Sequence, residues 1–74
     1  MGNKHIAEYK PGDTMPNGNT YLAARGTQDK WVVLSVCGGY EPFVVHNCNA
    51  IAETSSGRYF KSIEEAVKSL KERR

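Results

Sequence analysis

An almost continuous run of β-branched and aromatic residues, Lys30 to Val36, most constrains how this chain can fold. Such a run is typical of a strand buried within a sheet, because these side chains fit a pleated surface. Two glycines and a proline follow between positions 37 and 42, and Phe43 to Cys48 then forms a second apolar segment. The sequence therefore predicts a central strand that reverses through a loop of more than two residues into an antiparallel partner.

One further strand is predicted before this hairpin and a shorter one after it. Residues 19 to 25 follow a tight turn at Asn17-Gly18, and they lead into the central strand through a short polar connection. Arg58 to Phe60 can close a fourth short strand, after an exposed turn at Thr54 to Gly57. These segments predict an antiparallel sheet of three to four strands over residues 19 to 60.

The N-terminal residues 1 to 18 are predicted to form a turn-rich arm. Pro, Gly, Asp and Asn crowd positions 11 to 18, and this composition is typical of turns rather than of a regular element. Within the arm, residues 5 to 10 are expected either to form a short edge strand or to lie across the sheet.

The C-terminal segment is predicted to be an amphipathic helix over residues 62 to 73. Ser62 and Glu65 form a capping box, in which the Ser62 hydroxyl accepts from the Glu65 amide and the Glu65 side chain reaches back. Apolar residues then recur at i, i+3, i+4 and i+7, which gives the helix one apolar stripe: Ile63, Ala66, Val67 and Leu70. The chain is therefore predicted to be a single α+β domain over residues 1 to 74, with the sheet packed against this helix.

Composition and charge exclude several classes of protein. A chain of 74 residues holds one small core, and 39% hydrophobic with 24% charged residues is the composition of a folded domain. Charged residues of both signs are interspersed along the chain, and the net charge is only +2. The charge therefore does not predict strong electrostatic attraction of nucleic acid. Two cysteines are too few for a disulfide framework, and no apolar run near the N-terminus fits a signal or a membrane span. We expect a cytoplasmic protein.

Cys37, His46 and Cys48 lie on two strands that are predicted to pair, and His5 is a further possible zinc ligand. Structural zinc sites usually present their ligands in short paired motifs, and the sequence has neither Cys-x-x-Cys nor His-x3-His. A cysteine nucleophile would also need an oxyanion site and a cleft, which a sheet with one helix hardly provides. We predict no metal, no cofactor and no enzymatic activity, with a cysteine or zinc enzyme as the weakest of three hypotheses.

The leading hypothesis is a non-enzymatic protein-binding module that uses exposed loops and an open sheet edge. Aromatic residues and arginines are enriched among interface hot spots, and a tyrosine in a Gly-rich hairpin loop has little reason to be buried. The predicted contacts with a protein partner are Tyr9, Arg25, Tyr40, Glu41 and Arg58. Pairing of two copies through an open edge strand is an open question at this level.

The alternative hypothesis is a small nucleic-acid-binding protein. A sheet face that carries aromatic and basic side chains can stack unpaired bases and contact phosphates. The residues assigned to this role are Lys30, Lys61, Lys71, Arg73 and Arg74. Simpler explanations compete with it, because Trp31, Phe43 and Phe60 can form the core, and positive charge at the end of a helix favours its dipole.

The order of segments resembles small proteins encoded on bacteriophages and other mobile elements. The segments that carry this resemblance are Gly-Asn-Thr-Tyr-Leu-Ala-Ala-Arg, Lys-Trp-Val-Val-Leu, Pro-Phe-Val-Val-His and Gly-Arg-Tyr-Phe-Lys-Ser-Ile-Glu-Glu-Ala-Val, which cover most of the chain from about Pro11. Anti-CRISPR inhibitors belong to this group. The resemblance implies stoichiometric binding to a bacterial protein in the host cytoplasm, such as a CRISPR effector complex. The slightly basic charge argues against mimicry of DNA, which calls for strongly acidic chains.

Overall fold

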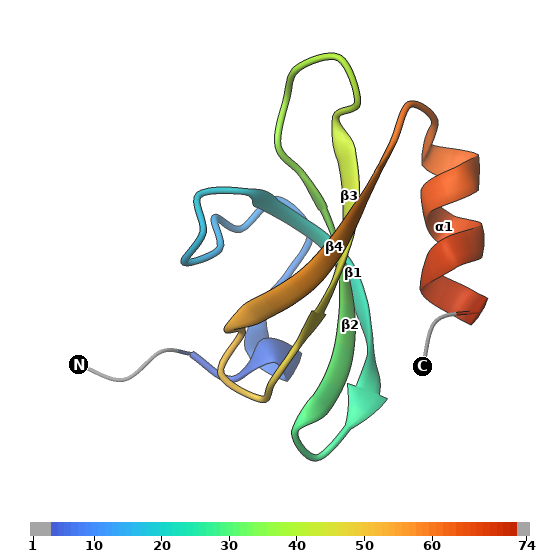
Figure 1. The fold of residues 1–74 in the computed structure, drawn as a ribbon. Coiled ribbons are helices and arrows are strands. Elements are labelled where there is room, and N and C mark those ends of the chain that lie inside the picture. The colour runs from blue at the N-terminus through green and yellow to red at the C-terminus, as the bar shows by residue number, and fades with distance from the viewer. Residues whose placement is uncertain (1–3, 73–74) are drawn as a thin grey trace.

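A computed structural model describes residues 4 to 72 and places them in one four-stranded antiparallel sheet with one α-helix against it (Figure 1). The elements follow in the order η1 (Ile6–Glu8), β1 (Thr20–Thr27), β2 (Lys30–Val36), β3 (Phe43–Cys48), β4 (Thr54–Phe60) and α1 (Ile63–Glu72). The strands lie in the sheet in chain order, as a meander. This arrangement confirms the predicted α+β fold, with β2 and β3 as the central pair.

The central strands are buried on both faces of the sheet. Side chains alternate along β2, so that Val33 faces one side while Val32 and Leu34 face the other. Val32 and Leu34 pack with Val45 of β3 against α1. A strand covered on both faces is expected to read as a continuous apolar run rather than an alternating one, which explains the sequence of residues 30 to 36.

The N-terminal segment covers the face of the sheet opposite α1. Ile6 of η1 is fully buried with Tyr9 and Met15 against Val33, and the Ile6 amide donates to the Ala50 carbonyl at 2.7 Å. Residues 5 to 10 thus lie across the sheet through a 3-10 turn and do not form an edge strand. The arm is an integral part of the core.

Asp13 holds the arm in place. Its carboxylate accepts from the Lys10 amide at 2.9 Å and forms an ion pair with Lys4 at 3.2 Å. These contacts lower the pKa of Asp13 below its ordinary value, the Lys10 hydrogen bond having the larger effect. The Asp13 carbonyl also accepts from the Tyr21 amide at 2.8 Å, which attaches the arm to the start of β1.

The C-terminal helix begins as its capping box predicts. The Glu65 amide donates to the Ser62 hydroxyl at 3.3 Å, and Ala66 and Leu70 are buried against the sheet. Ile63 departs from the predicted stripe, because it lies in the first turn and is 40% exposed. Arg73, which is also predicted to belong to the helix, lies outside the described residues.

The predicted exposed turn at Thr54 to Gly57 is wrong, because these residues form the first half of β4. The chain reverses earlier, at residues 49 to 53. There the Asn49 side chain accepts from the amides of Ile51 (3.1 Å) and Glu53 (3.0 Å). An asparagine that bonds its own following backbone forms a turn by itself, and the polar residues after it are left free to pair with β3.

The aromatic residues assigned to the core occupy its margin. Trp31, Phe43 and Phe60 are partly buried and pack around the edge of the two apolar clusters. The largest fully buried side chains are instead aliphatic, apart from Ser35, namely Ile6, Val33, Leu34, Val44 and Val45. None of the helices in residues 4 to 72 is long and apolar enough to cross a membrane.

Candidate protein-binding surface

The loop between β2 and β3 presents Tyr40 to solvent. The Cys37 amide donates to the Pro42 carbonyl at 2.8 Å and closes the base of the loop. Gly38 and Gly39 adopt positive φ angles of 81° and 89°, a conformation that glycine adopts without strain. The Tyr40 side chain is 83% exposed. The loop therefore displays an aromatic ring that takes no part in the core.

Lys61 lies beside this ring. Its Nζ is 4.4 Å from the centroid of the Tyr40 ring and donates to the Tyr40 hydroxyl at 3.0 Å. Lys61 belongs to the connection between β4 and α1, so two segments far apart in sequence meet here. This contact favours one arrangement of the ring, and a side chain already arranged before binding loses less entropy on binding.

Two further exposed hydrophobic residues flank Lys61 in the chain. The described residues include four large hydrophobic side chains with high exposure, and three of them lie in the loop or within two positions of Lys61: Tyr40, Tyr59 and Ile63. The fourth, Ile51, is in the turn at the other end of the sheet (Figure 1). We call Tyr40, Tyr59, Lys61 and Ile63 the hairpin-end surface.

The residues predicted to contact a protein partner are spread over several regions. Glu41 is exposed in the same loop as Tyr40. Tyr9 is only 9% exposed and packs 5.6 Å from the Tyr21 ring, so it belongs to the core. Arg25 donates to the Leu70 carbonyl at 3.4 Å and to the Lys71 carbonyl, and therefore caps the end of α1.

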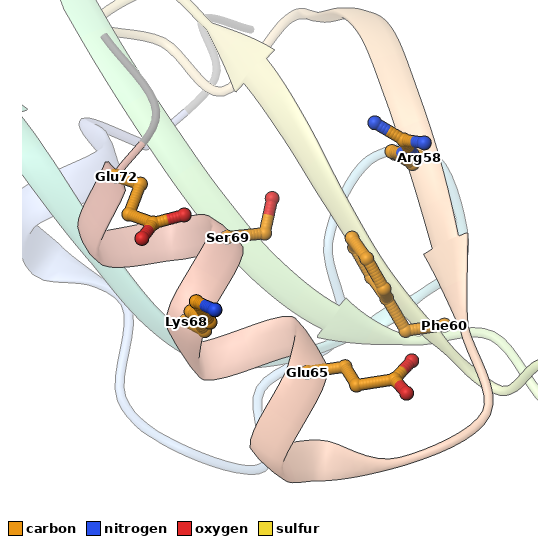
Figure 2. Close-up of a pocket in the computed structure, with 6 residues that line it drawn as sticks. All are labelled: Arg58, Phe60, Glu65, Lys68, Ser69 and Glu72. Atoms are coloured by element: carbon orange, nitrogen blue, oxygen red, sulfur yellow. The ribbon is translucent and has the colours of Figure 1, made fainter.

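Arg58 lies beside a shallow groove between β4 and α1. Figure 2 shows its position across from the helix, with both cations and carboxylates along the groove. The groove has a volume of about 470 Å³ and is lined by Arg58, Phe60, Glu65, Lys68, Ser69 and Glu72. Arg58 is exposed, as a residue that contacts a partner must be. It lies on a different part of the surface from Tyr40.

The basic residues assigned to nucleic-acid binding fall into two places. Lys30 and Lys71 line one groove together with Arg25 and Glu72, next to the end of α1. Lys61 lies apart from them, at the hairpin end. Arg73 and Arg74 lie outside the described residues.

The two cysteines lie at opposite ends of the hairpin formed by β2 and β3. Cys37 is exposed at the loop between β2 and β3, whereas Cys48 is buried at the far end of β3, about 20 Å of strand away. Burial raises the pKa of the Cys48 thiol to about 11, which keeps it protonated and weakly nucleophilic. His46 packs on the Gly57 backbone, and His5 accepts from the Ala7 amide at 3.0 Å. No group of three or more possible metal ligands occurs within residues 4 to 72.

Sequence reasoning did not identify Lys61, Tyr59 and Ile63 as part of a protein-binding surface. The signal is topological, because in a meander the loop after the second strand and the connection after the fourth lie at the same end of the sheet. Lys61 directly precedes the helix cap at Ser62, so the sequence does locate it in that connection.

No family model, curated protein or solved structure matches this chain.

Proposed function

We propose that this chain is a non-enzymatic protein-binding module that contacts its partner through the hairpin-end surface. The observation that carries the proposal is the exposed Tyr40 ring in the loop between β2 and β3, which Lys61 contacts. Tyrosine is enriched at interface hot spots, and the exposed Tyr40 ring takes no part in the core. The loop between β2 and β3 extends beyond the sheet (Figure 1), which suits insertion into a groove of a larger protein.

The partner class that we propose is a bacterial defence nuclease, such as a CRISPR effector complex. This part of the proposal comes from the resemblance of the segment order to small phage and mobile-element proteins. The mechanism would be stoichiometric: the hairpin end occupies a groove of the nuclease, in the bacterial cytoplasm, and blocks its nucleic acid or its moving parts. The interspersed charge of the chain favours contact with protein over imitation of DNA.

Replacing Tyr40 by Ala is expected to weaken partner binding about 30-fold without lowering the stability of the domain. Truncation of a central aromatic contact commonly costs about 2 kcal/mol of binding free energy, and Tyr40 makes no core contact that folding requires. Binding is measured by titrating the purified protein against candidate defence complexes that have been treated with nuclease. Thermal unfolding of the variant is measured alongside.

Ile51→Ala is the matched control, because Ile51 is also an exposed hydrophobic residue but lies in the turn at the other end of the sheet. The control should bind as the unmodified protein does. Equal affinity of the Tyr40 variant, or loss of its fold, would remove the hairpin end from the proposal.

Nucleic-acid binding is the second candidate function. It is favoured by one observation, the meeting of Arg25, Lys30 and Lys71 around a single groove. Three cations spaced along a groove can follow a phosphate backbone, although Glu72 in the same groove reduces the local positive charge. This groove lies away from the hairpin-end surface, so the two functions can be tested separately.

If this groove binds single-stranded nucleic acid, affinity is expected to fall steeply with salt. Three phosphate contacts give a slope of about −2 for the logarithm of the binding constant against the logarithm of salt concentration. The double variant Lys30→Ala, Lys71→Ala should reduce both affinity and slope, whereas Lys10→Ala on the N-terminal arm should change neither. Fluorescence anisotropy with a labelled oligonucleotide measures both quantities, and no binding at low salt would exclude this candidate.

A further inference from the structure

The outer edge of β4 is open. The strand order places β4 at one side of the sheet, and within residues 4 to 72 no segment pairs with its outer side. Its five central residues, 55 to 59, are all exposed. An edge strand of this kind presents unpaired backbone N–H and C=O groups to any strand that can approach.

The other edge of the sheet is protected by the chain itself. The Gly12 amide donates to the Tyr21 carbonyl, and Thr14 forms a bridge with Thr20, so residues 12 to 15 cover the start of β1. The pairing of β1 with β2 is also irregular between Tyr21 and Ala23, and such bulges hinder edge pairing. The β4 edge of the sheet is therefore open to pairing with another strand, whereas the β1 edge is not.

β4 carries few of the devices that keep edge strands apart. It contains neither lysine nor proline, its first half is made of small residues, and Arg58 is its one charged residue. One irregularity does occur in its pairing with β3, before Gly57, so the regular part of the strand runs from Gly57 to Phe60. If two β4 strands pair antiparallel, Arg58 of one faces Arg58 of the other only in the register centred on Arg58. Every other antiparallel register avoids a pair of like charges.

We propose that β4 pairs antiparallel with β4 of a second copy of this chain, so that two sheets join into one. Two-fold symmetry of this pairing places both α1 helices on the same face of the joined sheet. The grooves beside β4 then meet across the axis. Each groove contributes two cations and two carboxylates, Arg58 and Lys68 with Glu65 and Glu72, so the joined surface is complementary to itself in charge.

The same geometry explains why the assembly closes at two copies. An isologous contact uses the same surface on both partners, so it is used up once the pair has formed. Growth beyond a dimer would need the β1 edge, which residues 12 to 15 and the bulge obstruct. A small domain also gains from burying a further edge, because its own core is limited.

Ser56→Lys is expected to weaken the dimer about tenfold. We place the two-fold axis at Gly57, so that residue 56 of one copy faces Arg58 of the other. The substitution then sets like charges opposite each other at two symmetric positions. Ser56 is exposed and has no assigned partner on β3, so the change leaves the internal ladder intact. The mass is measured by light scattering and sedimentation from micromolar to millimolar protein, where the unmodified chain should approach twice 8.2 kDa.

Ser56→Glu is the second variant, since a carboxylate near Arg58 of the second copy should preserve or strengthen the dimer. Ile51→Lys adds the same charge in the turn between β3 and β4 and should leave the mass unchanged. A chain that stays at 8.2 kDa at every concentration would overturn the proposal, as would a Ser56→Lys variant that dimerises like the unmodified chain. Tyr40→Ala should not change the mass, so failure of the dimer and failure of the hairpin-end surface are distinguishable.

Discussion

Gly26→Ala is expected to destabilise the domain by about 3 kcal/mol, a large share of the roughly 4 to 11 kcal/mol that a chain of this size possesses. Gly26 has a φ of 147°, and a Cβ added there would meet the Lys30 carbonyl oxygen and lie 2.7 Å from the Trp31 Cα. Both are backbone atoms of β2. They cannot move aside without breaking the pairing of Gly26 with Trp31 in the sheet.

The loss at Gly26 has two causes, the positive φ and the clash of the added Cβ with β2, and Gly38→Ala separates them. Gly38 also has a positive φ, of 81°, but a Cβ there would meet nothing within 4 Å. Its substitution should therefore cost only the left-handed backbone penalty, about 1 to 2 kcal/mol. Urea denaturation of both variants gives the two free energies, and equal losses would mean that the approach of β2 to Gly26 is not a tight one.

The central hairpin and the helix could be predicted from sequence because their signals are local. The apolar run ends at Val36 with two glycines soon after, and Phe43 follows a proline, so the observed bounds of β2 and β3 coincide with the predicted ones. The Ser62 cap likewise fixes the start of α1. In each case the residue propensities, the hydrophobic pattern and the glycine, proline or capping residues at the ends predict the same element.

The first half of β4 could not be predicted in the same way. Thr54, Ser55 and Ser56 show no alternation of apolar and polar residues, because the strand is at the edge of the sheet and exposed through its centre. Thr54 pairs with Cys48 and Gly57 with His46, so the extended backbone between them is set by the β3 pairing on either side. That pairing depends on where the turn at Asn49 ends. Pairing with a neighbour leaves little trace in the side chains of an exposed edge strand.

The candidate surface was accessible to sequence reasoning only in part. A tyrosine after two glycines in a loop is expected to be exposed, and Tyr40 is. Tyr9 is predicted to contact a partner because aromatic residues are enriched at interfaces, yet it packs with Ile6 and Met15 on the sheet. The spacing of these three residues follows neither a helix nor a strand, so their common burial arises from the path of the arm.

Ile6→Ala is the second substitution expected to have a large effect, with a loss of about 3 kcal/mol. Ile6 is completely buried, and its removal leaves a cavity between the N-terminal arm and Val33 in the central strand. The Ile6 amide bond to the Ala50 carbonyl holds the arm in position, so the site cannot readily collapse around a smaller side chain. Thermal and urea unfolding of the variant measure the loss.

Ile51→Ala removes the same atoms from an exposed position and should change stability by less than about 0.5 kcal/mol. The difference between the two isoleucine substitutions measures how firmly the arm is packed. If both are nearly neutral, the arm is not part of the core and the Val33 face of the sheet is free for another partner. A large loss at Ile6 alone means that the chain itself fills the second face of the sheet. Binding must then be sought on the hairpin-end surface, the β4 edge and the groove of Lys30 and Lys71.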